Sequence, residues 1–184
     1  KDFEKIDISV PKDLHLTLGT IILPKPDTYG HNLYLDYCSN LISDDLHTLR
    51  LTIKESYPEY YEAFEKVMYR NNKVSRYNMF IMNWTDFDDY CTWLFGLLEK
   101  VENKIDIAHY NPIQSRIFGY MGEYLTNVFA EQRKMKIIHK PVIWFNDSGD
   151  FWSKSPIKYL IRKKMNNIGH FFTKQRGQTF HLKR

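Results

Sequence analysis

The chain has 184 residues and a net charge of +4, and 43% of its residues are hydrophobic and 16% aromatic. This composition excludes an intrinsically disordered protein, and the length suffices for one domain with a sizeable core. The weak positive charge argues against a dedicated nucleic-acid binder. Cys38 and Cys91 stand among apolar or aromatic residues, and we expect reduced core residues of a cytoplasmic protein. The polar opening of the chain does not resemble a secretory signal, and no apolar run approaches membrane-spanning length.

The first predicted element is a buried strand. Residues 20–23 form a compact apolar run, and Pro24 and Pro26 fix its end. Loops at strand ends face the ligand in many α/β proteins, so Lys25 and Tyr29 are candidate substrate-binding residues. A solvated connector is the default interpretation of this loop, and a phosphate or sugar contact from Lys25 is the alternative.

Three helices with short links are expected next. A short helical pattern covers residues 32–38. Asp44 or Asp45 is expected to cap a second helix that reaches Tyr57, and Pro58 to begin a third that reaches Met68.

A strand and a long helix are predicted after the turn that follows these helices. The strand is expected over residues 77–82, because this run is short, apolar and rich in aromatic and β-branched residues. Thr85 and Asp88 have the spacing of a capping box, and apolar residues then recur at helical spacing as far as Ile105.

A second long helix is predicted to begin at Asn111-Pro112 and to extend to Phe129. Gln114, Arg116 and Glu123 are polar residues among large apolar neighbours in this helix. Charged residues of an amphipathic helix usually lie on its solvated side. Arg116 and Glu123 are nevertheless about two turns apart, so the alternative is that both face one cleft as a guanidinium and carboxylate pair.

The acidic string Asp86-Phe87-Asp88-Asp89 has two competing interpretations. It contains Asp-x-Asp, a pattern with which many nucleotide-sugar transferases hold a divalent cation, and two such carboxylates can chelate a hard metal. The same acids fall in the first turn of the predicted helix, where they complement the helix dipole. We favour this second interpretation. No two of the seven histidines have the spacing of a metal site, so no metal ligands are predicted.

The last part of the chain predicts a strand and a basic helix. Residues 137–145 have a strand pattern interrupted by Pro141, which predicts an edge strand or a strand in two parts. Residues 155–184 form a basic amphipathic helix and tail with Phe171 and Phe172 near the helix end. This pattern is typical of a membrane-surface anchor, and a solvated helix docked on the domain would give the same pattern.

A series of motifs follows the chain over about residues 20–142, and their order and spacing are specific. The motifs are Ile21-Ile22-Leu23-Pro24-Lys25, Tyr57-Pro58-Glu59-Tyr60, Tyr77-Asn78-Met79-Phe80-Ile81-Met82, Phe87-Asp88-Asp89-Tyr90-Cys91-Thr92-Trp93, Ile105-Asp106-Ile107 with Tyr110, and Gln114-Ser115-Arg116-Ile117-Phe118-Gly119-Tyr120 with Glu123. Together they resemble a bacterial family of capsular-polysaccharide and O-antigen glycosyltransferases, catalogued as domain of unknown function 4422.

The resemblance implies a GT-A-like, Rossmann-like fold and transfer of a sugar from a nucleotide-sugar donor to a glycan or lipid-linked acceptor. The family's Arg-x-x-Gly-x-x-x-Glu pattern falls on Arg116, Gly119 and Glu123, and its Asn-Met-Phe strand begins at Asn78. As a hypothesis, Glu123 serves as the base for an acceptor hydroxyl and Arg116 offsets charge on the departing diphosphate. Asn78, Gln114, Tyr110, Lys25 and Tyr29 complete the candidate substrate site, with Mn or Mg as the cation that a nucleotide-sugar donor would bring.

Nothing between Lys1 and Gly19 resembles the family's His-Tyr-Arg-Arg-type motif, so the N-terminal nucleotide-binding half is expected to be missing. We therefore expect a partial α/β domain over residues 1–150, with a small mixed sheet, several long helices and the acceptor side of the site. Residues 151–184 are expected to form the basic helix and tail, with peripheral contact to the inner face of the cell membrane and no role in nucleic-acid binding. The alternative function is a non-catalytic fragment or paralogue that binds glycan, membrane or a partner enzyme.

Overall fold

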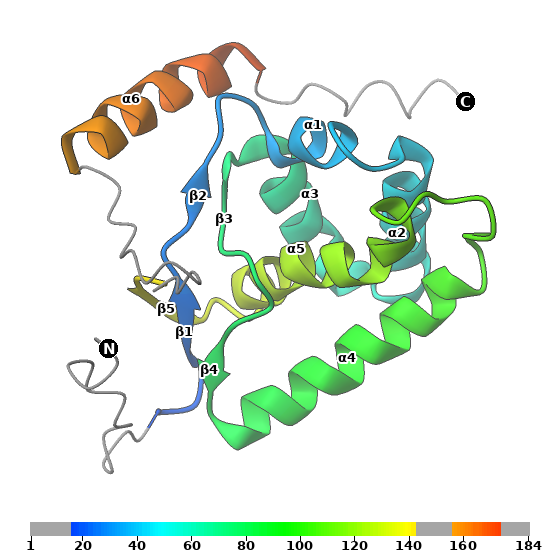
Figure 1. Cartoon of the computed structure of the whole chain (residues 1–184). Coiled ribbons are helices and arrows are strands. Elements are labelled where there is room, and N and C mark those ends of the chain that lie inside the picture. The colour runs from blue at the N-terminus through cyan, green and yellow to red at the C-terminus, as the bar shows by residue number, and fades with distance from the viewer. Residues whose placement is uncertain (1–15, 143–155, 174–184) are drawn as a thin grey trace, which may run out of the picture.

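The computed structural model describes residues 16–142 and 156–173, and within these it forms an α/β fold, as expected (Figure 1). A three-stranded sheet lies on one side of the molecule and a group of helices on the other (Figure 1). Strand β1 (Thr20–Pro24) is its middle strand, antiparallel to β4 (Ile81–Met82) and parallel to β5 (Lys136–Lys140). Ile21 pairs with Met82 on one side and Ile137 on the other.

The strand expected over residues 77–82 is shorter than predicted. Only its last two residues belong to β4, because Tyr77 and Asn78 have φ angles of 78° and 48°. These angles belong to the left-handed region, which ends an extended strand. Strand β5 lies at the edge of the sheet, as predicted, and ends before Pro141; residues 143–145 of the predicted strand lie outside the described part of the chain.

A second, two-stranded sheet was not predicted. Strand β2 (Asp27–Thr28) pairs antiparallel with β3 (Lys73–Val74), and the Tyr29 amide continues the pairing by donating to the Asn72 carbonyl over 2.9 Å. Two-residue strands leave no apolar pattern that could predict them. This pairing brings the loop after β1 beside the segment that leads to Arg76.

The three helices of the first half form where the pattern predicts them. The side chain of Asn32 caps α1 by accepting from the Leu35 amide. The prediction that Asp44 or Asp45 caps α2 is wrong, because the N-cap position is Ile42, which makes no side-chain cap bond, and the two acids lie in the first turn. Pro58 begins a 3₁₀ turn that leads directly into α3. The bounds are α1 Leu33–Cys38, α2 Ser43–Ser56 and α3 Tyr61–Arg70.

The two long helices begin at residues other than the predicted ones. Asn83, not Thr85, caps α4 (Trp84–Glu102), because its side chain accepts from the Thr85 amide. Residues 114–116 form a 3₁₀ turn, and α5 (Ile117–Gln132) begins only after it. Asn111 therefore organises a turn ahead of the helix, with its side chain accepting from the amides of residues 113 and 114.

Helix α5 lies at the centre of the helical group (Figure 1), and most of its residues from Ile117 to Ala130 are buried. Its buried side chains Leu125 and Phe129 meet α3 and α4, and Phe129 lies 5.7 Å from the ring of Trp93. Tyr60 stacks on the same Trp93 at 4.3 Å. Buried aromatic rings contribute strongly to the stability of a domain core. Their packing holds α5 in place, and with it the polar residues on this helix.

Helix α6 (Pro156–Thr173) lies against β2, apart from the main helical group (Figure 1). The basic C-terminal segment thus contains a helix. Among the described residues, no helix combines the length and the apolar character needed to cross a bilayer.

Candidate functional site

Arg76 lies at the centre of a polar cluster formed by four separate segments. Its guanidinium donates to the Tyr29 hydroxyl over 2.8 Å and to the Tyr124 hydroxyl over 3.3 Å, and it forms ion pairs with Asp36 and, at 3.4 Å, with Glu123. Tyr124 also donates to Asp36 over 2.8 Å. We call these five residues the Arg76 cluster.

The position of the Arg76 cluster follows from the fold. Arg76 comes two residues after β3, Tyr29 directly follows β2, Asp36 lies on α1, and Glu123 and Tyr124 lie on α5. The segment next to Arg76 is bound to α5, because the backbone of Ser75 exchanges two hydrogen bonds of 2.9 and 3.1 Å with the Asn127 side chain. 

Burial and charge raise the pKa of the phenols in the cluster. Desolvation and the nearby charge of Asp36 raise the pKa of Tyr29 to about 12, and the same two causes raise the pKa of Tyr124. Burial opposes the charge of Arg76, but Tyr124 and Asp36 together raise its pKa. The cluster thus keeps its tyrosines protonated as hydrogen-bond donors and its arginine charged at neutral pH.

Glu123 is the most loosely held acid of the cluster. Its carboxylate meets the guanidinium at 3.4 Å, beyond the usual length of a charge-assisted hydrogen bond. Within the described residues no other side chain bonds to this carboxylate, and 16% of its side chain is solvent-accessible. Glu123 therefore keeps hydrogen-bonding capacity for a ligand, as the predicted role requires.

The predicted pairing of Arg116 with Glu123 is not what the structure shows, since Arg76 is the guanidinium that faces Glu123. Arg116 is exposed on the 3₁₀ turn before α5, and its guanidinium lies 5.6 Å from the centre of the Tyr120 ring. The helix begins one residue later than Arg116, so the two residues do not share the uninterrupted helical spacing that the prediction assumed. Their proposed catalytic roles stay predictions.

Asn78 lies beside the first turns of α5, and Gln114 lies in the 3₁₀ turn before this helix. The Asn78 side chain donates to the Gly119 carbonyl over 3.1 Å, and its oxygen would be 3.1 Å from a Cβ at Gly122, directly before Glu123. Gln114 is half-buried and accepts from the Asn111 amide over 3.2 Å. Asn78 thus lies beside the turn of α5 that presents Glu123, whereas Gln114 supports the loop before the helix.

Tyr110 and Lys25 lie outside the Arg76 cluster. The Tyr110 hydroxyl donates to Asp45 Oδ1 over 2.7 Å and ties the loop before α5 to α2. Asp45 Oδ2 and the Tyr37 hydroxyl are buried without a hydrogen-bond partner among the described residues. Lys25 is exposed, and its backbone amide continues the pairing of β1 with β5 by donating to the Lys140 carbonyl.

Two of the acids at the start of α4 bond to other parts of the protein. Asp86 is buried and accepts from the Gly19 amide over 2.8 Å, and Asp89 pairs with Arg133. In residues 16–142 and 156–173 no three His, Cys, Asp or Glu side chains are placed to hold a metal ion.

The sequence did not point to Arg76, Asp36 or Tyr124 as site residues. Arg76 and Asp36 are 40 residues apart, and Arg76 and Tyr124 are 48 apart, so no local pattern connects them. One signal was available: Arg76 is a single cation immediately before the predicted strand, and Tyr29 after β1 was already a candidate.

Comparison with known proteins identifies the family. The sequence matches the family described as domain of unknown function (DUF4422) over residues 9–134, and the chain belongs to this family. The match begins before the expected Thr20 and ends before Val142. No curated protein matches the sequence.

One solved structure with a similar fold is a WbbM bifunctional glycosyltransferase in its apo form. The similarity has a TM-score of 0.61 at 27% sequence identity, and it covers 65% of this chain and 23% of that chain. The chain thus spans less than a quarter of the length of this neighbour. The likeness confirms the α/β class and indicates a protein of the glycosyltransferase kind.

Proposed function

We propose that this DUF4422 domain transfers a sugar from a nucleotide-sugar donor to a glycan or lipid-linked acceptor, in the synthesis of a capsule, O-antigen or exopolysaccharide. The observation that supports the proposal most is the loosely held Glu123 carboxylate in the Arg76 cluster, in a domain that is similar to part of a bifunctional glycosyltransferase.

The chemistry of the cluster suits an acceptor hydroxyl. Transfer requires that this hydroxyl lose its proton as it attacks the sugar carbon, and a carboxylate within hydrogen-bond reach can accept that proton. Glu123 is our candidate for this base. Arg76 acts as a positioning residue, because its guanidinium meets the Glu123 carboxylate, and the hydroxyls of Tyr29 and Tyr124 hold that guanidinium in place.

Arg116 is our candidate for the charge that builds up on the leaving diphosphate. Arg116 is exposed on the turn before the start of α5, and a guanidinium's fork of N–H donors matches phosphate oxygens in a bidentate manner. We assign no residues to Mn or Mg, because the described residues contain no group of three His, Cys, Asp or Glu side chains placed to hold a metal ion.

Substitution of Glu123 and Arg116 tests these roles. Glu123→Gln and Arg116→Ala are each expected to reduce the transfer rate by about 10²- to 10⁴-fold while leaving the melting temperature nearly unchanged. The measurements are transfer from a set of nucleotide sugars to purified glycan acceptors and thermal unfolding followed by circular dichroism. A comparable loss of folding would show that the two residues are structural.

The chain offers a matched control for each variant. Glu131 and Arg133 lie near the far end of α5, where Glu131 pairs with Lys66 and Arg133 lies 5.6 Å from the Phe129 ring. Glu131→Gln and Arg133→Ala make the same chemical changes and are expected to leave transfer intact. If the unsubstituted chain neither transfers a sugar nor binds UDP, with or without manganese, the proposed function is wrong.

A cytoplasmic location with peripheral contact to the inner membrane face belongs to the same proposal. Nucleotide sugars are the donors that the proposed reaction consumes, and a lipid-linked acceptor would be presented at a membrane surface. The basic composition of residues 155–184 supports such a contact.

A further inference from the structure

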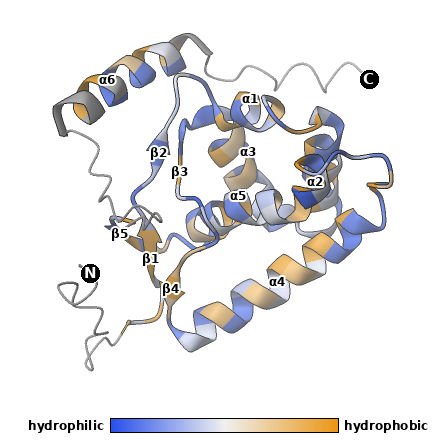
Figure 2. Cartoon of the chain, viewed as in Figure 1, coloured by the Kyte–Doolittle hydropathy of each residue, from blue (hydrophilic) through white to orange (hydrophobic). Residues whose placement is uncertain are grey.

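Helix α6 turns its apolar side away from the protein. Five apolar side chains are between 56% and 76% exposed, and the spacing of Ile161, Met165 and Ile168 is that of one helix face. In a helix that packs on a globular core, such residues face inward. Figure 2 shows this helix as an amphipathic element beside the main body. The five residues, which we call the α6 ridge, are Leu160, Ile161, Met165, Ile168 and Phe171.

The opposite, polar side of α6 makes the contacts with the protein. The Asn166 side chain donates to the Thr28 carbonyl on β2. Asn167 accepts from the Asn72 side chain over 3.2 Å. These polar contacts orient the helix so that the ridge remains outside.

Close backbone packing strengthens this orientation. A Cβ added at Gly169 would lie only 2.7 Å from the carbonyl oxygen of Gly30, so the helix and the loop after β2 approach each other as closely as glycine permits. His170 Nε2 lies 3.3 Å from the Arg70 carbonyl oxygen at the end of α3. The helix is therefore held on the body at several points along its polar side.

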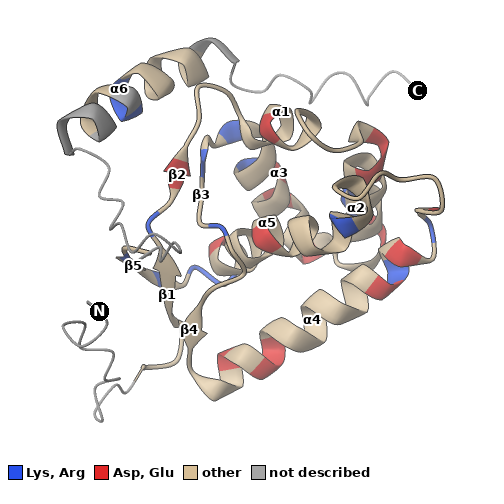
Figure 3. Cartoon of the chain, in the orientation of Figure 1, with Lys and Arg blue, Asp and Glu red and all other residues tan. Residues whose placement is uncertain are grey.

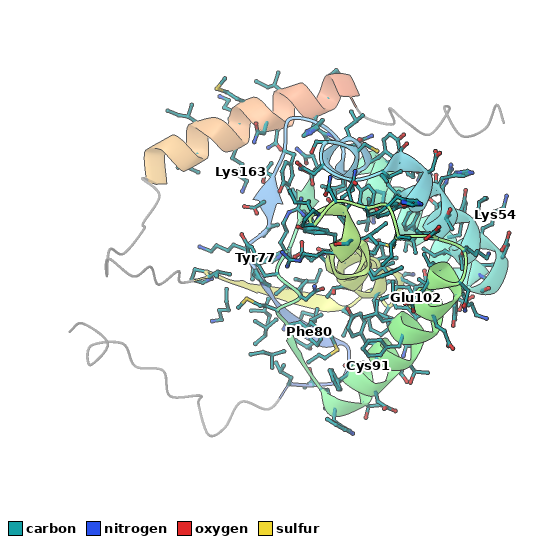
Figure 4. All side chains as sticks on the ribbon, turned by 45° about the vertical axis from the view of Figure 1, so that its right-hand side comes forward. Lys54, Tyr77, Phe80, Cys91, Glu102 and Lys163 are labelled. Carbon is teal, nitrogen blue, oxygen red and sulfur yellow. The ribbon has the colours of Figure 1, made fainter. Side chains whose placement is uncertain are left out.

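The basic and acidic residues are unevenly distributed along the chain. Residues 155–184 contain eight Lys or Arg and no Asp or Glu. The remaining 154 residues contain 18 basic and 22 acidic residues, a net charge of −4. In the described part of α6, Figure 3 shows Lys but no acid, and Figure 4 shows Lys163 on the side of the helix toward β2. A strongly basic segment thus carries an exposed apolar ridge.

We propose that α6 is an in-plane membrane helix that docks the domain on an anionic phospholipid surface. Apolar side chains of such a helix enter the boundary of the acyl chains, while lysines reach the phosphates at its sides. A second copy of the chain would bring two segments of charge +8 together, which repel each other. A nucleic acid would meet apolar side chains where it needs cations. An anionic lipid surface offers acyl chains to the apolar α6 ridge and negative charge to the basic residues.

The docking places the lipid surface beside the candidate site. Asn166 contacts the carbonyl of Thr28, and the next residue, Tyr29, bonds to Arg76. The Arg76 cluster is therefore connected directly to the strand on which the membrane helix rests. The link between membrane docking and the Arg76 cluster rests on the proposed function. In that reaction the acceptor is lipid-linked and reaches the cluster from the membrane surface.

Vesicle binding by the full 184-residue chain tests the docking. We expect it to sediment with phosphatidylcholine vesicles that contain phosphatidylglycerol, and much less with phosphatidylcholine alone. The double variant Ile161→Asp with Ile168→Asp is expected to reduce the binding constant at least tenfold. Lys164→Gln, at an exposed position of α6, is expected to reduce it about fivefold, which corresponds to about 1 kcal/mol, on the anionic vesicles only.

Phe95 provides the matched control, because it is an apolar residue that is 64% exposed on α4. Phe95→Asp should leave vesicle binding unchanged. Full vesicle binding by the double variant overturns the proposal. A dimer that the double variant abolishes, or RNA binding that it abolishes, would identify a second copy or a nucleic acid as the partner and also overturn it.

The outcome can be separated from that of the proposed function. Vesicle binding requires no catalysis, so a chain that binds anionic vesicles but transfers no sugar leaves the membrane helix standing and removes the proposed function. If both hold, the double variant should keep transfer to a water-soluble acceptor and lose transfer to a vesicle-bound one. Equal transfer to both acceptors would show that the docking does not serve the site.

Discussion

Arg50, which is buried, and Arg76, which is half-buried, are held in opposite ways. Arg50 on α2 meets one carboxylate, that of Glu65 on α3, through a bidentate pair of 2.6 and 3.0 Å. Only 8% and 6% of the two side chains are accessible. The guanidinium also lies 5.0 Å from the ring of Tyr69. The guanidinium thus joins two adjacent helices through one carboxylate, which it meets with two parallel hydrogen bonds.

The Arg76 guanidinium instead contacts residues on two helices, α1 and α5, and in the loop after β2. Asp36 and Tyr29 are its near partners, and Glu123 lies at 3.4 Å. The side chains of this cluster that carry charge are between 11% and 17% accessible, roughly twice as much as at the Arg50 pair. The cluster has one cation for two acids, so a negative charge is left over.

The difference separates a structural ion pair from a candidate site. The Arg50 pair is closed, because a bidentate carboxylate leaves neither partner free for a ligand. The Arg76 cluster is open at Glu123, and it exists only when β2, β3, α1 and α5 are all in place. We therefore expect substitutions at Arg50 to change stability alone, and substitutions at Arg76 to change stability and transfer.

The largest expected effect is at Arg50. Arg50→Met should lower the free energy of unfolding by about 3–5 kcal/mol, because it leaves the Glu65 carboxylate buried without a cation. Urea denaturation at pH 7 measures it. The double variant Arg50→Met with Glu65→Leu should regain most of the loss, since apolar residues of similar volume can replace a buried pair. A double variant as unstable as the single one would show that the pair itself is needed.

A more conservative change should distinguish the two arginines by function. Lysine keeps the charge but has no planar fork, so Arg50→Lys and Arg76→Lys are each expected to cost about 1–3 kcal/mol of stability. Only Arg76→Lys should also reduce transfer, because a lysine cannot hold Tyr29, Asp36 and Glu123 together. Transfer rates and urea denaturation of the two variants are measured in parallel. Equal transfer by both would place the Arg76 cluster among the structural ion pairs.

The same contrast shows which features the sequence can predict. Strand β1 was predicted within a residue, because an apolar run followed by prolines is a local signal. The starts of α1 and α3 were also local, set by Asn32 and Pro58. For α4, two polar residues stood at the helix start, and the sequence alone did not show that Asn83 would be the cap rather than Thr85.

The Arg76 cluster could not be predicted from such signals. Its contacts join residues 40 to 88 positions apart, and they depend on the two-residue strands β2 and β3. The left-handed backbone at Tyr77 and Asn78 also interrupts a run that looks like a strand. Glu123 and Tyr29 were found as single candidates, but their connection through Arg76 follows only from the tertiary structure.

Asp45 extends the comparison to a buried acid whose bonded partner is a phenol rather than a cation. Only 5% of Asp45 is accessible, Tyr110 donates to Oδ1, and Oδ2 has no hydrogen-bond partner among the described residues. Desolvation raises the pKa of this carboxyl. The folded state therefore prefers its protonated form, and this contribution to stability is present at low pH and is lost as the pH rises through the folded-state pKa.

Asp45→Asn should accordingly stabilise the protein by about 1 kcal/mol at pH 7, because the amide keeps an acceptor for Tyr110 and removes a buried charge. The gain should shrink as the pH falls toward about 4, the ordinary range for an aspartate, where the wild-type carboxyl also becomes neutral. Urea denaturation of both proteins at several pH values measures the difference. A variant that is less stable than the wild type at pH 7 would mean that the charged carboxylate is bound by a further donor, and the buried Tyr37 hydroxyl is the first candidate for it.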